Sequence, residues 1–298
     1  MNVIGRKHIF LAFSGVLVIA SFVALATWGL KLGIDFTGGS MLEVSFPDGR
    51  PGADLVAKKL DGVGLGDAVV QFAGEKEVMM RFRDIDEPTH QNILHELGTL
   101  GRVSEQRFDT IGPTIGAELK RRAIIALVLA LAVIILYISW AFRQVSKPLS
   151  SWKYGTVAVI VALFHDVIIP VGAFSFLGHF KGAEADTLFI TALLTILGFS
   201  VHDTIVVFDR TREHLRTLKK PELFDETVNQ SVNETFVRSL FTSLTVLLVL
   251  AVIFLIGGAS THYFAFTLIV GVLFGTYSSI FIASPLLVIW NDFTRKRL

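Results

Sequence analysis

Long apolar runs alternate with short polar segments along most of the chain. A helix needs about 20 mostly apolar residues to cross the hydrocarbon core of a bilayer. Six runs are close to this length or longer, at residues 9–30, 121–142, 155–177, 187–208, 240–258 and 264–290. The pattern therefore predicts six membrane-spanning helices.

The first and last of these runs each raise a further question. Ala24-Leu25-Ala26 resembles the cleavage site of a signal peptide, but the apolar core of such a peptide covers only about 7–15 residues. We therefore expect the longer run at 9–30 to be an uncleaved anchor. The sixth run contains Pro285, which cannot donate a backbone hydrogen bond, so a kink or tilt is expected near its end.

Residues 31–120 have the pattern of a small soluble domain. Alternating apolar and polar positions predict four strands, and helical spacing predicts two helices. The strands are expected at 41–46, 68–72, 78–82 and 103–108, and the helices at 53–60 and 88–97. The order βαββαβ is that of the ferredoxin-like arrangement, in which two helices cover one face of an antiparallel sheet. The predicted fold class is an α-helical membrane protein with one small α+β ferredoxin-like domain.

The loops between the predicted spans differ in Lys and Arg content, which sets membrane orientation. Basic residues gather at one set of ends: Arg6, Lys7, Arg143, Lys147, Lys153, Arg210, Arg212, Arg216, Lys219, Lys220, Arg295, Lys296 and Arg297. The alternate short loops contain Lys181 and, at 259–263, no basic residue. We therefore expect residues 1–8 and 291–298 in the cytoplasm and residues 31–120 on the outer side. Residues 209–239 are expected to form a cytoplasmic loop with an amphipathic surface helix.

Composition excludes several functional classes. Charged residues make up 18% of the chain, against about 25% in soluble domains, and the net charge of +1 argues against binding to nucleic acid. There is no cysteine, which excludes disulfides, thiolate nucleophiles and cysteine-ligated metals. No pattern of a nucleophile with its base, or of metal ligands, is present. We expect neither enzymatic activity nor a cofactor.

Two groups of polar residues lie inside predicted spans, where a charge costs at least about 2.5–3.5 kcal/mol. His202, Asp203 and Thr204 lie in the fourth span, with Asp203 about 8 Å inside its predicted end. Asp203 is either a structural acid that links helices or a carboxyl that binds and releases protons. Arg238, just before the fifth span, is the candidate cation for such an acid, because its long side chain can reach along the helix.

His165 and Asp166 form the second group, in the third span. Adjacent residues point about 100° apart on a helix, so these two need not act as a pair. The alternatives are a direct proton relay and a hydrogen-bonding role in helix packing. Neither polar group has a second histidine at ligand spacing, so no metal site is expected.

Several segments, in their order along the chain, resemble the SecF family. They are Gly33 to Gly39 before the first strand, Ile111 to Gly116 before the second span, the His165-Asp166 and Asp203 to Arg210 stretches, Arg238 with Thr242-Ser243, and Gly275 to Pro285. The resemblance runs from the first span almost to the C-terminus. It implies half of an RND-type membrane bundle, completed by a homologous SecD half, and the length suits a separate SecF chain rather than a fused one.

The resemblance also implies a function and its site residues. The expected role is to promote preprotein translocation by the Sec machinery, using the proton-motive force, in the bacterial cytoplasmic membrane. The implied partners are SecD, the SecYEG translocon with YajC- or YidC-like accessory proteins, unfolded preprotein and membrane lipid. Asp203 matches the family's essential intramembrane acid and Arg238 its basic partner, while His202 and Phe199 stand where the family usually has Asn and Tyr. A translocon scaffold without proton coupling and half of an RND-type small-molecule exporter remain alternatives.

Overall fold

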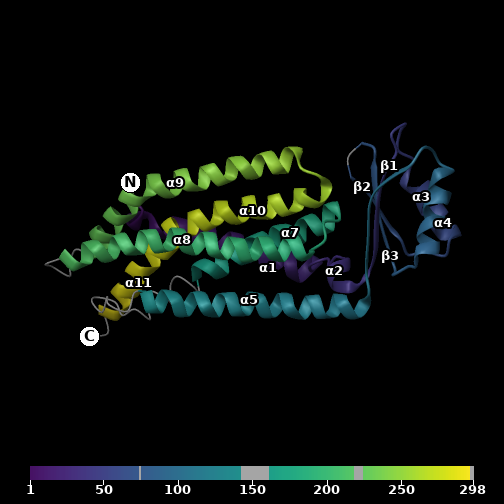
Figure 1. The fold of residues 1–298 in the computed structure, drawn as a ribbon. Helices are drawn as coiled ribbons and strands as arrows, with labels where there is room; N and C mark the ends of the chain where they lie inside the picture. Colours follow the sequence, from purple (N-terminus) through teal and green to yellow (C-terminus); the bar gives the residue numbers. More distant parts are fainter. Residues whose placement is uncertain (74, 142–160, 218–223, 296–298) are drawn as a thin grey trace. The chain divides into compact units, whose positions relative to one another are not determined.

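The computed structural model describes residues 1–73, 75–141, 161–217 and 224–295, and the chain divides into two compact units. One unit contains most of the helices and comprises Met1–Leu30, Ala126–Ala183 and Leu188–Leu298. The other comprises Lys31–Ile125 together with Glu184–Thr187 and contains the sheet (Figure 1). A short segment between two long helices therefore belongs to the sheet-containing unit.

Six helical stretches in the described residues are long and apolar enough to cross a membrane. The helices of this part of the chain are α1 (Lys7–Trp28), α5 (Pro113–Ala141), α7 (Phe164–Lys181), α8 (Thr187–Thr217), α9 (Phe224–Ile256), α10 (Ala259–Ser278) and α11 (Ser284–Arg295), with short turns η1 (Ile4–Arg6) and η4 (Ser279–Ala283). The protein is therefore a multi-pass membrane protein, as the sequence predicts. Of the predicted third span, residues 155–160 lie outside the described residues.

The spans differ strongly in how much of each is buried inside the protein. More than half of the most apolar stretch is buried in the spans built on α7 and α10, and half in the span of α8, whereas only 6% is buried in α5. α7, α8 and α10 therefore form the centre of the bundle. Most of the apolar surface of α5 is therefore exposed in this chain.

Close approach of the central helices depends on glycine. A Cβ at Gly172 of α7 would overlap Ser21 of α1, and a Cβ at Gly271 of α10 would overlap Ile196 of α8. Helices in lipid gain little from the hydrophobic effect, so van der Waals contact across such small residues holds them together. The contact at Gly271 brings α10 close to α8, where the hydroxyls of Thr204 and Ser279 lie 2.8 Å apart.

The last span is interrupted before its proline. α10 ends at Ser278, η4 is a π-helical turn over Ser279–Ala283, and α11 begins at Ser284. Pro285 lacks the N–H that an α-helix would use here, and the Ser284 hydroxyl donates a 3.1 Å hydrogen bond to the carbonyl of Ser279. The π-helical turn therefore lies just N-terminal to Pro285, the residue from which the sequence predicts a kink.

The predicted surface helix within residues 209–239 is not a separate element in the described residues. α8 continues to Thr217, and α9 begins at Phe224 and runs without a break into the fifth span. The reason is a buried stripe in the first turns of α9: Phe224 and Val228 pack into the same core cluster as Phe208 of α8. The sequence prediction was wrong because this amphipathic stripe faces another helix rather than the membrane surface.

The second unit has the predicted ferredoxin-like topology. Its elements are α2 (Ile34–Thr37), β1 (Gly39–Ser45), α3 (Ala53–Gly62), β2 (Val69–Ala73), β3 (Glu77–Phe82), α4 (Glu87–Gly98) and β4 (Ser104–Ile111). The strands pair antiparallel in the order β2-β3-β1-β4, and both long helices lie on one face of the sheet (Figure 1). Leu42, Val44 and Met80 from the sheet pack in one core with Val56 of α3 and Ile93 of α4.

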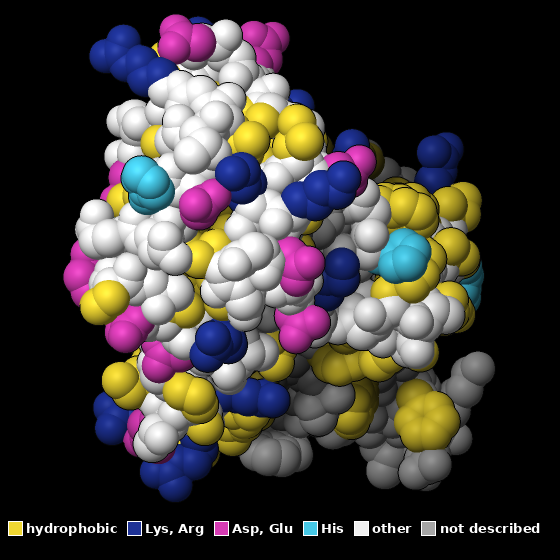
Figure 2. Space-filling model, turned by 90° about the vertical axis from the view of Figure 1, so that its right-hand side faces the viewer, with side chains coloured by type: hydrophobic (Ala, Val, Ile, Leu, Met, Phe, Trp, Pro, Cys, Tyr) yellow, Lys and Arg dark blue, Asp and Glu magenta, His cyan; other side chains and the backbone are white. Residues whose placement is uncertain are grey.

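The surface of the molecule in Figure 2 mixes charges of both signs with apolar side chains. Such a mixed surface is typical of a water-exposed domain and differs from the apolar exterior of α5. The described part of the chain thus combines a lipid-compatible bundle with a soluble α+β unit, which confirms the predicted fold class.

The segment Glu184–Thr187 is built into the sheet-containing unit by several contacts. Ala185 donates a 2.7 Å hydrogen bond to the carbonyl of Lys31 and accepts a 2.8 Å bond from the amide of Gly33. The side chain of Glu184 forms an ion pair with Arg81 of β3. Burial raises the pKa of the Glu184 carboxyl, while the Arg81 guanidinium acts in the opposite direction.

Candidate intramembrane acid site

Asp203 lies on α8 with its side chain buried against α10. Asp203 is 1% exposed, and its Oδ2 atom is buried without a hydrogen-bond partner in the described part of the chain. The hydroxyl of Thr276 on α10 is a hydrogen-bonding neighbour of this carboxyl. Thr276 Oγ1 in turn lies 2.5 Å from Ser243 Oγ on α9. A short line of polar groups therefore connects Asp203 on α8 through α10 to α9.

Arg238, the predicted partner of Asp203, does not contact it directly. Within the described residues, no ion pair within 4.0 Å involves Arg238, and its side chain is exposed. It lies five residues before Ser243 on α9 and contributes a longer-range attraction to the Asp203 carboxyl. The two residues are thus on neighbouring elements, and the Ser243–Thr276 hydrogen bond lies between them.

His202 and Thr204 flank Asp203 but face different surroundings. The side chain of His202 is 61% exposed, and its Nδ1 lies 3.8 Å from Asp203 Oδ1. Thr204 is buried, and its hydroxyl lies 2.8 Å from the Ser279 hydroxyl in the π turn. His202 therefore connects the acid with the exterior of this chain, whereas Thr204 connects the same helix with η4.

Asp166 occupies the other side of the interface between α8 and α10. Its carboxyl is fully buried and accepts hydrogen bonds from Ser200 of α8 and, at 2.7 Å, from Ser278 of α10. A third bond of 2.8 Å joins Asp166 Oδ1 to His165 Nδ1. Although the two residues are adjacent on a helix, they form a hydrogen-bonded pair. The sequence did not decide whether His165 and Asp166 act as a pair, and the structure shows that they are hydrogen-bonded.

Five hydroxyl residues of these networks were not predicted as site residues. They are Ser200, Ser243, Thr276, Ser278 and Ser279. Serine and threonine are common in membrane helices, so their presence alone gives little signal. Three of them, Thr276, Ser278 and Ser279, could have been identified by their concentration after Gly275, in the segment that also carries Pro285.

The charged residues at the end of α8 pair with one another rather than with Asp203. Arg210 lies 2.5 Å from both Glu213 and Glu234, and Asp209 pairs with Arg212. Where residues are described, no group of three or more His, Asp or Glu side chains that could hold a metal ion is found. The arrangement around Asp203 and Asp166 therefore offers protonation and hydrogen bonding as its chemistry.

Comparison with known proteins identifies the family. Residues 90–292 match the family described as "Protein export membrane protein SecD/SecF, C-terminal", and residues 23–46 match the "SecD/SecF GG Motif". The protein translocase subunit SecF of Anaerolinea thermophila is 40% identical, with 98% of this chain and 94% of the relative covered. SecF of Vibrio alginolyticus is 39% identical, with 92% and 84% covered.

Solved structures agree with this. The crystal structure of SecDF from Thermus thermophilus, a translocon-associated membrane protein, matches with a TM-score of 0.85 at 32% identity over 98% of this chain. The present chain covers 39% of the length of that protein. A second SecDF structure, in the super-membrane-facing form, matches with a TM-score of 0.70 at 30% identity and has the same 39% covered. Because the export-protein family covers most of the chain and its SecF members align with it almost end to end, the chain belongs to the SecF family of protein-export membrane proteins.

Proposed function

We propose that this chain is a SecF-type subunit of the Sec protein-export machinery. It works with SecD and uses the proton-motive force to promote translocation of preproteins across the bacterial cytoplasmic membrane. The relatives named as translocase subunits support the export role. The observation that carries the energy coupling is Asp203, a buried acid between three spans with one carboxylate oxygen that has no partner in the described residues.

Proton uptake by Asp203 is the proposed coupling step. A buried carboxylate with an unsatisfied oxygen is costly in a membrane, and a proton on that oxygen removes the charge. Neutralisation also removes the attraction to Arg238. It changes the hydrogen bond that the Thr276 hydroxyl donates to the carboxyl, because a neutral acid is a weaker acceptor than a carboxylate. The hydrogen bond between Thr276 and Ser243 transmits this change to α9. One charge crossing the full potential supplies about 2.3 kcal/mol per 100 mV, enough to bias two arrangements of the helices.

The proposed orientation places both ends of the chain in the cytoplasm and residues 31–120 outside. The distribution of Lys and Arg supports it. In the bundle, the N-terminus is held beside the start of α9, where the Asn229 side chain accepts hydrogen bonds from the amides of Val3 and Ile4. Proton uptake would then occur from the outer side and release toward the cytoplasm.

The proposed partners follow from the same role. The outward apolar surfaces of α5 and α9 offer area for a homologous SecD bundle as well as for lipid. SecYEG, with YajC- or YidC-like proteins, is the translocon that the pair assists, and unfolded preprotein is the substrate. The exposed His202, beside Asp203, is a candidate contact with the SecD half.

Substituting Asp203 tests the proposal. Asp203→Asn keeps size and shape but cannot change its charge, so we expect proton flux and export stimulation to be lost in vesicles that contain SecD and the translocon. Asp209→Asn on the same helix is the matched control, because Asp209 is exposed and pairs with Arg212 outside the buried network. Normal flux and export with Asp203→Asn, in protein that inserts and binds SecD, would leave only the scaffold role.

A further inference from the structure

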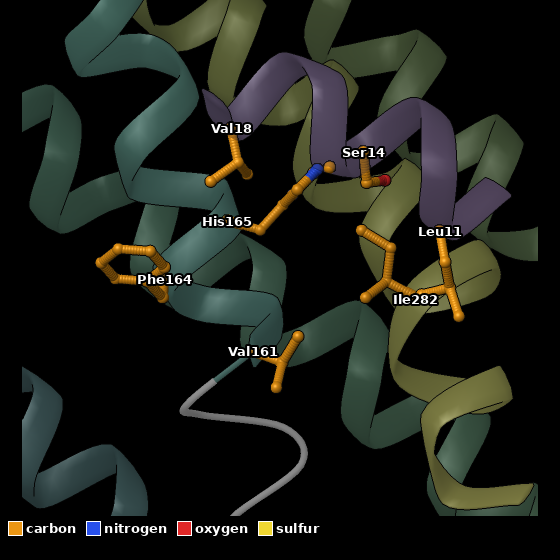
Figure 3. Close-up of a pocket in the computed structure, with 8 residues that line it drawn as sticks. Leu11, Ser14, Val18, Val161, Phe164, His165 and Ile282 are labelled. Atoms are coloured by element: carbon orange, nitrogen blue, oxygen red, sulfur yellow. The ribbon is translucent and has the colours of Figure 1, made fainter. Parts of the chain in front are cut away.

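The imidazole of His165 has one nitrogen hydrogen-bonded to Asp166, and its residue lines a cavity. Nδ1 is 2.8 Å from Asp166, whereas Nε2 is buried and has no hydrogen-bond partner in the part of the chain that is described. Figure 3 shows the ring extending from α7 toward α1, where Ser14 lies. The residue is 3% exposed, so its second nitrogen is directed into the protein and not into lipid.

The cavity at Nε2 has a volume of about 340 Å³ and lies between α1, the first turn of α7 and η4. Most of its lining is apolar and includes Val18, Phe164 and Ile282. His165 and the buried Ser14 are its polar members. A buried water needs about 10–15 Å³ and at least two polar partners, and these two side chains provide them. His165 Nε2 and Ser14 Oγ, both buried and without a hydrogen-bond partner in the described residues, are the atoms that would bind water in this mostly apolar pocket.

The opposite end of the pair reaches the centre of the bundle. Asp166 joins His165 to Ser200 on α8 and Ser278 on α10. The phenol of Tyr277 on α10 stacks on the His165 ring at 6.3 Å, and no Lys, Arg or further acid pairs with Asp166 in the described residues. His165 and Asp166 thus form a polar connection from the cavity to the hydroxyl groups between α8 and α10.

We propose that His165 and Asp166 form a second protonation site, which takes up protons from water in this cavity. A hydronium ion gives its proton to His165 Nε2 and becomes water, while Nδ1 passes its own proton to Asp166 Oδ1. The imidazole is left neutral with hydrogen on Nε2, and Asp166 becomes a neutral acid. Release follows the same steps in reverse. This relay rests on the proposed function for its driving force, but its protonation chemistry is independent of Asp203.

Protonation of Asp166 has a structural consequence. A neutral carboxylic acid is a weaker acceptor than a carboxylate, so the bonds from Ser200 and Ser278 weaken. Ser278 ends α10, and the next residue, Ser279, starts the π turn and contacts Thr204 beside Asp203. π turns often occur at functional sites, where a helix can shift register. The second site would therefore control the segment of α10 against which Asp203 also packs.

Infrared difference spectroscopy on the full chain in lipid, paired with SecD, tests the site directly. The pH is changed from about 5 to about 9, a range that brackets the ordinary pKa of histidine. We expect a carboxylic acid band that is absent from Asp166→Asn and present in Asp203→Asn. If wild type and Asp166→Asn give the same bands, the inference is wrong, whatever Asp203→Asn does to export. Loss of export in Asp203→Asn together with a persisting Asp166 band supports both proposals separately.

The relay through His165 has its own kinetic test. After a pH jump, the Asp166 band should appear about tenfold more slowly in His165→Gln, since general acid–base groups contribute at least this much to proton transfer. His179→Gln is the control, because His179 lies on the same helix and stacks on Trp28 away from the cavity. An unchanged rate in His165→Gln would overturn the relay.

Discussion

At the scale of single residues, the two buried acids differ in how well their oxygens are satisfied. Asp166 accepts three hydrogen bonds, from its neighbour His165 and from hydroxyls on two other helices. Asp203 has an oxygen without a partner in the described residues and one threonine hydroxyl nearby. A satisfied carboxylate fixes its neighbours in place, whereas an unsatisfied one changes partners readily. The difference supports Asp203 as the acid of the proposed coupling step. It makes Asp166 a link between helices, and the protonation inferred above would weaken its bonds from Ser200 and Ser278.

Thr276 should be important for coupling because its hydroxyl lies between Asp203 and Ser243. We expect Thr276→Val, which keeps the shape, to lower proton flux in vesicles about fivefold, since a hydrogen bond contributes about 1 kcal/mol. Thr276→Ser retains the hydroxyl and should keep near-normal flux. Equal loss in both variants would point to packing of the lost methyl group instead.

The sequence predicts the acids but not their surroundings. Asp203, Asp166 and His165 are evident because ionisable residues are rare in apolar runs. The serines and threonines that contact them could not be predicted, because which face of a helix meets which neighbour depends on tertiary packing. For the same reason the sequence predicts Arg238 near Asp203 but does not reveal that Thr276 of α10 and Ser243 of α9 connect their two helices.

At the scale of the elements, small residues set the distance between helices. Gly172 of α7 faces the backbone of Ser21 on α1, so an added methyl group has no room to move into. Gly198 of α8 has no atom within 4 Å of an added Cβ. Both glycines are in helices, where alanine is intrinsically preferred by about 0.5–1 kcal/mol. Comparing alanine substitutions at Gly172 and Gly198 therefore separates the effect of packing on stability from the effect of helix propensity.

We expect Gly172→Ala to lower the free energy of unfolding by about 1–3 kcal/mol, the usual cost of overpacking, and Gly198→Ala to leave it unchanged or raise it. Thermal unfolding of the purified chain in the same lipid would measure both. A stabilising effect of Gly172→Ala would mean that α1 and α7 are not held at this distance.

Helices and strands were predictable where local periodicity decides them. The six spans and the βαββαβ order come from apolar runs and alternation, which the chain carries within each element. The continuation of α8 and α9 beyond the predicted spans was not predictable, because Phe224 and Val228 form a stripe that suits either a membrane surface or another helix. The π turn likewise depends on the hydroxyls of Ser279 and Ser284 as well as on Pro285.

At the scale of the whole molecule, one short segment belongs to the sheet-containing unit although it connects two spans. Glu184–Thr187 follows α7 and leads into α8, and its backbone pairs with residues 31–33. Asp35 accepts hydrogen bonds from the amide of Thr187 at 2.8 Å and from its hydroxyl at 2.5 Å, which caps the start of α8. The rearrangement of α7 and α8 proposed above would therefore act on a segment that is part of the sheet-containing unit's own structure.

The ion pair between Arg81 and Glu184 should hold this segment in place, since both side chains are less than 20% exposed. Reversing one charge, in Arg81→Glu or Glu184→Arg, leaves like charges together and should weaken the segment by about 1–3 kcal/mol. The double reversal restores opposite charges and should recover most of the loss, which a double-mutant cycle isolates. Hydrogen exchange at the Ala185 amide, bonded to Lys31, reports the opening of the segment in the full chain. If each single reversal leaves exchange unchanged while export continues, the segment is held by its backbone bonds alone and does not depend on this ion pair.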